Sequence, residues 1–176
     1  NRGVTMELGG KNALYVRADA DLDQAVEETM KAKFATSGQD CLGANRIFVE
    51  RGIYDAFVEK FAAATKDLSI GIGMDDPEIG PLMNEKAVAK CEAHVADALE
   101  KGAKLLCGGA RDDQGILFYQ ATVLGDVTPD MDIYTQETFG PVAPLVKFSS
   151  ETEVIKAAND TIYGLPAYLY SDNIRR

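Results

Sequence analysis

The sequence has little cysteine, and its cysteines are far apart. Only Cys41, Cys91 and Cys107 occur, and no two of them form a CxxC pair. An odd number of distant thiols argues against a disulfide framework and against a structural zinc site, because both need paired or clustered ligands. We therefore expect no metal site and, by default, a reducing cytoplasmic location.

Positive charge is also scarce. The 18 Lys and Arg residues face 28 Asp and Glu residues, which gives a formal net charge of −10. Nucleic acids and anionic membranes bind basic surfaces, so neither is expected as a partner. The sequence also lacks an apolar run of membrane-spanning length and a signal-like N-terminus. A length of 176 residues with 46% hydrophobic and 26% charged residues predicts one globular domain with a sizeable core.

Histidine is nearly absent, since His94 is the only one. It falls in a segment with the pattern of a structural helix, so a surface or hydrogen-bonded helical histidine is the favoured interpretation. A reactive thiol in this chain should then use a carboxylate as its base. Cys91 lies on the apolar face of the same helix and Cys107 ends a predicted strand, so we interpret both as packing residues.

Strand and helix patterns alternate along the chain with short turns between them. This order favours an α/β fold with an open, largely parallel sheet flanked by helices. Strands are predicted at residues 4–8, 13–16, 46–50, 104–107, 118–124, 142–148 and 165–170. Helices are predicted from a cap at Asp19 or Asp21 to about Gly38, along 54–62, from about Asn84 to Lys101, and after a capping box formed by Ser150 and Glu153.

Cys41 occupies a junction between a predicted helix and a predicted strand. The small residues Gly38 and Gly43 flank it and would let a substrate and backbone N–H groups approach closely. Asp40 argues the other way, because an adjacent negative charge disfavours a thiolate unless its side chain points away. A buried, inert cysteine is the alternative interpretation.

Two carboxylates stand in segments that could serve a site. Glu7 ends an apolar strand pattern and precedes Gly9 and Gly10, so partial desolvation would suit it to act as a base. Its alternative is a loop carboxylate paired with Lys11 or Arg2. Glu137 lies in a loop closed by Gly140-Pro141, and it is either part of a binding loop of fixed shape or a surface charge in a turn.

Three segments together resemble the aldehyde dehydrogenase superfamily. They are Met6-Glu7-Leu8-Gly9-Gly10-Lys11, the run Phe34 to Arg46 with Gly38-Gln39-x-Cys41, and Gln136-Glu137-Thr138-Phe139-Gly140-Pro141. Their order and the 34-residue gap between Glu7 and Cys41 also fit. The resemblance covers essentially the whole chain. Segments such as Gly80-Pro81-Leu82 and Glu137 to Pro144 are most similar to the succinate-semialdehyde dehydrogenase group.

The resemblance implies a role for each matched residue. Cys41 is matched to the nucleophile, which forms a thiohemiacetal and then a thioester with the aldehyde. Glu7 is matched to the base that activates water to hydrolyse the thioester. Glu137 is matched to the carboxylate that holds the nicotinamide ribose of NAD or NADP. Phe139 is matched to the aromatic residue beside the nicotinamide. Further matches are Leu8 and Gly9 as backbone near the cofactor ring, and Asp40 and Leu42 beside the nucleophile as part of the substrate pocket.

The expected function is the oxidation of an aldehyde, with succinate semialdehyde as the example, to its acid with NAD(P)⁺. We expect residues 1–176 to be the catalytic domain of a longer homo-oligomeric enzyme. Its cofactor-binding domain and C-terminal segment would lie outside this sequence, so the isolated chain should be inactive. Two alternatives stay open at this point: a non-catalytic α/β module, and an acylating aldehyde reductase that uses the same thiol.

Overall fold

The chain forms one six-stranded sheet between two layers of helices. We describe residues 3, 8–173 and 175 of a computed structural model. The strand order is β3-β4-β5-β2-β1-β6, and all neighbouring pairs are parallel except the antiparallel β3–β4. This confirms the predicted open, largely parallel sheet. The strands are β1 Asn12–Val16, β2 Ala44–Glu50, β3 Lys104–Cys107, β4 Thr122–Gly125, β5 Val142–Phe148 and β6 Tyr168–Tyr170.

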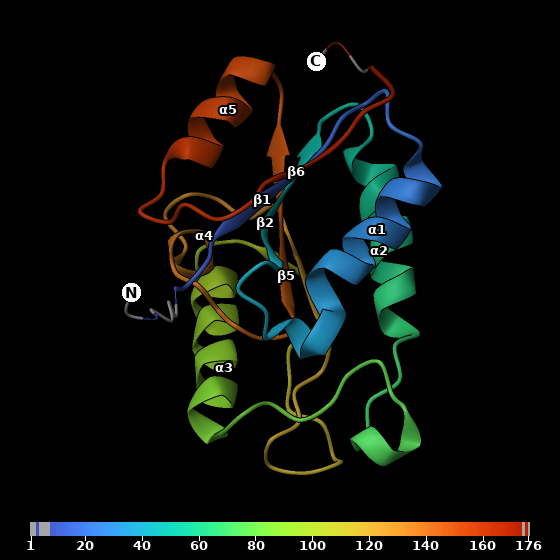
Figure 1. The fold of residues 1–176 in the computed structure, drawn as a ribbon, viewed down its shortest axis with the longest axis vertical. Coiled ribbons are helices and arrows are strands. Elements are labelled where there is room, and N and C mark those ends of the chain that lie inside the picture. The colour runs from blue at the N-terminus through green and yellow to red at the C-terminus, as the bar shows by residue number, and fades with distance from the viewer. Residues whose placement is uncertain (1–2, 4–7, 174, 176) are drawn as a thin grey trace.

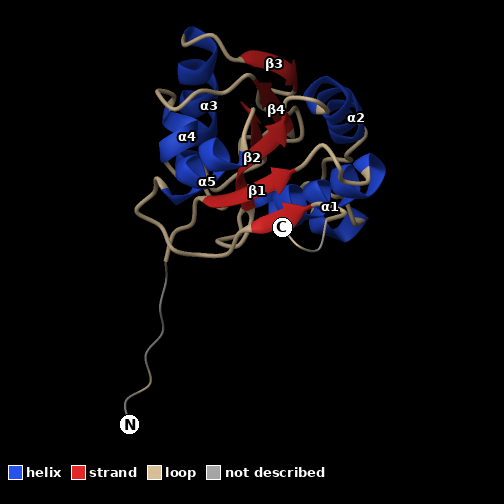
Figure 2. Cartoon of the chain, turned by 90° about the horizontal axis from the view of Figure 1, so that it is seen from above, coloured by secondary structure: helices blue, strands red, loops and turns tan. Residues whose placement is uncertain are grey.

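Each face of the sheet carries its own set of helices. Figures 1 and 2 show α1 and α2 on one face and α3, α4 and α5 on the other. Side chains alternate along the central strands, so Ile47 and Val49 join the core under α1 and α2 while Phe48 joins the core under α3. The helices are α1 Leu22–Phe34, α2 Tyr54–Lys66, α3 Glu85–Glu100, α4 Asp132–Thr135 and α5 Glu151–Asn159.

Side-chain oxygens cap three helix starts: Asp21, one of two predicted candidates, the predicted Ser150, and Asn84 at the predicted start of α3. The Asp21 side chain accepts a hydrogen bond from the Gln24 N–H at 2.9 Å, and Asn84 and Ser150 cap α3 and α5 in the same way. These side-chain oxygens satisfy N–H groups that have no partner inside the helix. Gly102 follows α3 with a φ of 98°, as expected for a residue that ends a helix.

Some predicted strands are shorter in the structure. The run predicted at 118–124 is a strand only from Thr122, because the Gln120 N–H donates to Ala110 O in a neighbouring loop and not to the sheet. The run predicted at 165–170 is a strand only from Tyr168; Pro166 has no N–H for the ladder. Of the strand predicted at 4–8, only Leu8 lies within the described residues, and it is not in a strand.

The sheet brings three loops to one edge. Because β1, β2 and β5 are parallel neighbours, the segments just before them meet at the amino ends of these strands. Those segments hold Gly9-Gly10, Cys41 and Glu137 respectively. The register of β1 on β2 shifts at this same edge, because Asn12 pairs with Ala44 and Ala13 with Arg46, which leaves Asn45 of β2 as the extra residue. Within the described part of the chain, no helix has both the length and the apolar character needed to cross a membrane.

Candidate functional site

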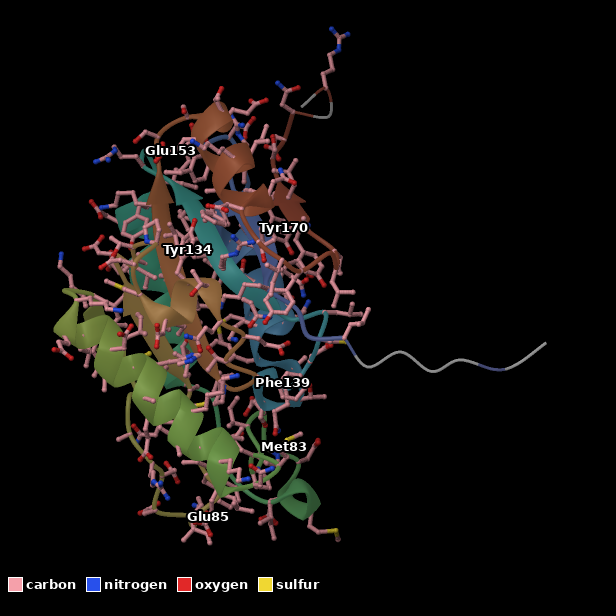
Figure 3. All side chains as sticks on the ribbon, turned by 90° about the vertical axis from the view of Figure 1, so that its left-hand side faces the viewer. Met83, Glu85, Tyr134, Phe139, Glu153 and Tyr170 are labelled. Atoms are coloured by element: carbon pink, nitrogen blue, oxygen red, sulfur yellow. The ribbon has the colours of Figure 1, made fainter. Side chains whose placement is uncertain are left out.

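Three hydrogen bonds join the three loops at the amino edge of the sheet. The Gly10 N–H donates to Glu137 Oε1 at 2.7 Å, across 127 positions of sequence. The Asn12 amide donates to Cys41 O at 2.7 Å and to Gly43 O at 3.0 Å. The three segments that carry the resemblance therefore form one continuous cluster. Figure 3 shows Phe139 toward this end of the molecule, and Glu153 and Tyr170 toward the opposite end.

Two glycines permit the close approach of these loops. A Cβ atom at Gly10 would lie 2.3 Å from Cys41 O, and one at Gly38 would lie 2.3 Å from Gly140 O. Neither gap could hold a side chain without moving backbone. Gly38 also has a φ of 70°, a region that residues with a side chain rarely adopt. Glycine is therefore needed at both positions for the site to close.

Cys41 is exposed in a tight turn that precedes β2. The Asp40 carboxylate accepts a hydrogen bond from the Leu42 N–H at 2.8 Å, and the Gly43 N–H donates to Asp40 O at 3.1 Å. The Tyr168 hydroxyl donates to Leu42 O at 2.7 Å from β6. Asp40 therefore shapes the turn that presents the thiol, whereas the predicted place of Asp40 and Leu42 in a substrate pocket stays a prediction. The Leu42 side chain is 46% exposed.

The loop that carries Glu137 and Phe139 is attached to α3. Thr138 is buried, and its hydroxyl shares a 2.9 Å hydrogen bond with Nδ1 of the buried His94. Burial, with smaller contributions from Lys11 and Lys90, lowers the pKa of His94 to about 4, so its ring is neutral near pH 7. His94 is thus the hydrogen-bonded helical histidine expected from the sequence. The hydrogen bond between His94 and Thr138 was not predicted. The pattern of apolar residues along a helix does not indicate which loop a histidine contacts.

Two buried lysines lie next to Glu137. The side chains of Lys11 and Lys33 are 2% and 1% exposed. Burial, reinforced by the neighbouring Lys33 and Arg46, lowers the pKa of Lys11 well below its usual range, while the nearby Glu137 opposes this shift. Burial likewise lowers the pKa of Lys33 to about 8. Among the described residues, Lys11 Nζ has no hydrogen-bond partner. Glu137 is half-buried, and its charge partly opposes the lowering of both lysine pKa values.

Arg46 fixes the backbone on which this arrangement depends. Its guanidinium donates to Lys11 O at 3.2 and 2.9 Å and to Ala157 O and Ala158 O at 2.8 and 2.9 Å. Burial lowers the pKa of Arg46, although the carbonyl oxygens satisfy its donors. Sequence reasoning missed Arg46 and Asn12. The sequence did hold one indication of their importance, because each is a polar residue near the start of an otherwise apolar strand.

The surroundings of Gly9 leave one oxygen of Glu137 uncovered by a side chain. A Cβ at Gly9 would lie 2.8 Å from Glu137 Oε2 and 3.2 Å from the Tyr163 ring. Because glycine has no Cβ, the backbone of residue 9 can lie close to the carboxylate of Glu137. The neighbouring Leu8 is exposed. Glu7, the predicted base, lies outside the described residues.

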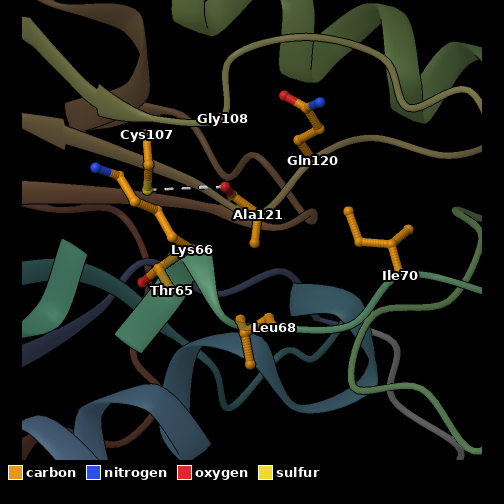
Figure 4. A pocket seen from close by; sticks show the side chains of 8 residues that line it. All are labelled: Thr65, Lys66, Leu68, Ile70, Cys107, Gly108, Gln120 and Ala121. Atoms are coloured by element: carbon orange, nitrogen blue, oxygen red, sulfur yellow. Dashed lines mark hydrogen bonds between the residues drawn. The ribbon is translucent and has the colours of Figure 1, made fainter. Parts of the chain in front are cut away.

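The other two cysteines are not at the surface of this cluster. Cys91 is buried beneath it, and Cys107 lies away from it. Cys91 is fully buried, and its Sγ packs against Gly140, where a Cβ would lie 2.5 Å from the sulfur. Cys107 lines a separate cavity of about 210 Å³ between α2 and β3. Figure 4 shows this cavity with the 4.0 Å contact from Cys107 Sγ to Ala121 O. None of the residues predicted for the site line it. Within the described ranges, no group of three or more His, Cys, Asp or Glu side chains could hold a metal ion.

Comparisons with known proteins cover nearly the whole chain. The model of the aldehyde dehydrogenase family matches residues 2–176. Succinate-semialdehyde dehydrogenase (NADP(+)) GabD of Escherichia coli (strain K12) is 50% identical over 174 residues, which are 98% of this chain and 36% of that protein. The 3-sulfolactaldehyde dehydrogenase of Pseudomonas putida is 51% identical with the same coverage.

A solved structure supports the fold as well. The crystal structure of succinate-semialdehyde dehydrogenase from Burkholderia pseudomallei superimposes with a TM-score of 0.94 at 51% identity, and the match covers 97% of this chain and 36% of that one. The chain therefore spans about a third of the length of the curated relatives that it matches.

Proposed function

Because the chain belongs to the aldehyde dehydrogenase family, we propose that the protein containing it oxidises an aldehyde to a carboxylic acid with NAD(P)⁺ and uses Cys41 as the nucleophile. The observation that carries this proposal is that one segment contacts both other loops. Its Gly10 N–H donates to Glu137, and its Asn12 amide donates to the backbone of the exposed Cys41. A thiol and a carboxylate from distant segments are held at one edge of the sheet by backbone contacts that only glycine permits.

In the proposed reaction, the Cys41 thiolate attacks the aldehyde carbon and forms a thiohemiacetal. The Cys41 N–H would stabilise the oxyanion, together with an asparagine from a segment outside this sequence. Loss of a hydride from the same carbon leaves a thioester on Cys41. Glu7 then takes a proton from water, the hydroxide attacks the thioester, and the acid departs as the thiol is restored.

NAD(P)⁺, when bound, supplies the acceptor for the hydride. The residues present fit this cofactor, because the Gly10 N–H fixes Glu137 Oε1 and Gly9 places no side chain over Oε2. Glu137 would hold the nicotinamide ribose through that oxygen. Phe139 would lie beside the nicotinamide, and the backbone of Leu8 and Gly9 would approach the ring.

The substrate class follows from the names of the relatives. Succinate semialdehyde and 3-sulfolactaldehyde are both short aldehydes that carry a second, acidic group. We propose an aldehyde of this class for the present protein, with succinate semialdehyde as the first candidate and either NAD⁺ or NADP⁺ as the oxidant. A panel of succinate semialdehyde, 3-sulfolactaldehyde and uncharged butanal with both cofactors would test it. Equal kcat/KM for butanal and the anionic aldehydes would contradict the substrate class.

The remaining parts of the proposal concern the whole protein. The 176 residues would be its catalytic domain, and a cofactor-binding domain from the rest of the chain would complete the site. This agrees with the 36% of each relative that the match covers. We further propose a cytoplasmic homo-oligomer, on the strength of the family resemblance and the absence of a disulfide pattern.

Two substitutions in the whole protein test the proposed chemistry. Cys41→Ala should abolish turnover, because no other thiol lies at the cluster, whereas Cys107→Ala should leave it unchanged. Glu7→Gln should still form the thioester but hydrolyse it slowly, so the first turnover should appear as a burst of NAD(P)H before a slow steady state. Stopped-flow absorbance at 340 nm measures both. Full turnover by Cys41→Ala would refute the proposal.

A further inference from the structure

Directly before Cys41, the chain makes a left-handed turn of three consecutive residues. Thr36, Ser37 and Gly38 have φ values of 50°, 59° and 70°. Glycine adopts this region readily, but a β-branched threonine and a serine rarely do. Such conformations persist only where the surrounding structure holds them in place. Neighbouring contacts must therefore fix this turn.

The side chain of Ser37 provides such a contact. Its hydroxyl accepts a hydrogen bond from the Gly80 N–H at 2.8 Å and donates to Gly80 O at 3.2 Å. Ser37 is 5% exposed, so water does not compete freely for these groups. One hydroxyl thus satisfies both polar groups of a residue 43 positions away in the sequence.

A second contact holds the other side of Gly38. The Gln39 side chain accepts from the Met83 N–H at 2.8 Å and donates to Pro81 O at 3.4 Å. The segment Gly80 to Met83 is itself anchored, because the neighbouring Ile79 and Leu82 are buried in the core at 0% and 2% exposure. The turn before Cys41 is therefore tied to a part of the chain that cannot shift freely.

We infer that Ser37 is a positioning residue for Cys41. Its paired hydrogen bonds to Gly80 hold the left-handed turn, and the turn sets the direction in which the chain enters residues 39–43. Only the description of Cys41 as the nucleophile rests on the proposed function. The hydrogen bonds of Ser37 to Gly80, and their effect on the conformation of the turn, do not depend on the proposed function.

Amide hydrogen exchange on the 176-residue chain tests the inference without any assay of catalysis. Ser37→Ala should speed exchange at least tenfold at the Gly80 N–H and also at the Gln39 and Gly43 N–H groups, whose bonds to Thr36 O and Asp40 O form the turn. Exchange in β2 should stay unchanged. If the Gln39 and Gly43 rates stay within twofold of the original chain, Ser37 does not position the turn.

Two further variants separate the contact from a general loss of stability. Ser37→Gly removes the hydroxyl but also the steric conflict at positive φ, so its exchange at Gln39 and Gly43 should rise less than in Ser37→Ala. Ser149→Ala removes a serine that accepts a hydrogen bond from Arg51 beyond the opposite end of the sheet, and it should leave these rates unchanged. Equal acceleration by Ser149→Ala would overturn the inference.

In the whole protein, a positioning role predicts a specific kinetic pattern. Ser37→Ala should lower kcat for the aldehyde about tenfold and leave KM for NAD(P)⁺ within twofold, because Glu137 and the neighbouring Thr138 keep their own contacts with the Gly10 N–H and His94. A fall in kcat together with an equally large rise in KM for NAD(P)⁺ would indicate a disturbed fold and would contradict the inference. Altered exchange without any catalysis would show that the proposed function fails while the positioning role stands.

Discussion

Glu137 is fixed by one of its two oxygens, and this determines what a substitution there should do. Glu137→Gln keeps the size of the side chain but removes its charge. We expect KM for NAD(P)⁺ to rise about tenfold, since a hydrogen bond to a charged group contributes roughly 1.5–3 kcal/mol. Steady-state kinetics of the whole protein measure this. Glu92→Gln, in an exposed ion pair with Arg111, is the matched control and should leave KM unchanged.

Lys33 makes stability depend on pH in an uncommon direction. Its pKa is about 8 in the folded chain and near 10.5 when exposed, so the unfolded chain holds more protons between these values. Stability should therefore rise with pH across this window, and the full cost of about 3 kcal/mol applies below pH 8.

Lys33→Met should remove that cost while filling a similar volume. Urea unfolding at pH 7 should show a more stable protein, and the gain should shrink toward pH 10. Lys31→Met, whose ammonium is exposed in the same helix, serves as the control and should show no comparable gain. An equal midpoint for Lys33→Met and the original chain at pH 7 would contradict the assigned pKa.

At the scale of elements, α3 acts as a platform for the loop of Glu137 and Phe139. His94→Leu should leave the buried Thr138 hydroxyl without a partner and destabilise the chain by about 1–3 kcal/mol. It should also raise KM for NAD(P)⁺, because Glu137 is next to Thr138. The double variant His94→Leu, Thr138→Val removes both polar groups and should recover much of the stability. Thermal unfolding and steady-state kinetics distinguish these outcomes.

The sequence predicts regular elements well where the local signal is strong. The strands at 104–107 and 142–148 and the cap at Ser150 agree with the structure, and Asp21 is the one of two predicted candidates that caps α1, because short apolar runs and side-chain oxygens act locally. The left-handed turn at Thr36 and Ser37 could not be predicted, since both residues disfavour it. Tertiary contacts, among them those of Ser37 to Gly80 and of Gln39 to Met83, hold that turn in place.

At the scale of the whole molecule, the order of parallel strands decides which loops meet. Motif resemblance predicted the membership of the cluster, Cys41 with Glu137 and Gly9. It could not predict the hydrogen bonds that assemble it, because Asn12, Arg46 and His94 act across long sequence distances. Such contacts depend on register and packing, which a single sequence does not encode locally.

The isolated 176-residue chain should bind NAD(P)⁺ weakly. The described residues offer Glu137 and nearby backbone to one end of the cofactor, and the proposed function assigns the rest of the binding surface to another domain. Isothermal calorimetry should detect no binding tighter than about 1 mM, equivalent to roughly 4 kcal/mol. The whole protein is the positive control. Micromolar binding by the chain alone would contradict this division of the site.

The register shift between Asn12 and Ala13 limits which changes in chain length the site can tolerate. One extra residue in a strand moves the backbone by about 3.3 Å and turns every following side chain to the other face. Asn12 lies at this register shift and donates to Cys41 O at 2.7 Å, so the register links the strands to the residue that carries the thiol. Insertions and deletions near Cys41 would therefore disrupt core and site together, whereas the surface loop at 108–117 could vary in length. The spacing of residues around Cys41 is as much a part of the site as their identity.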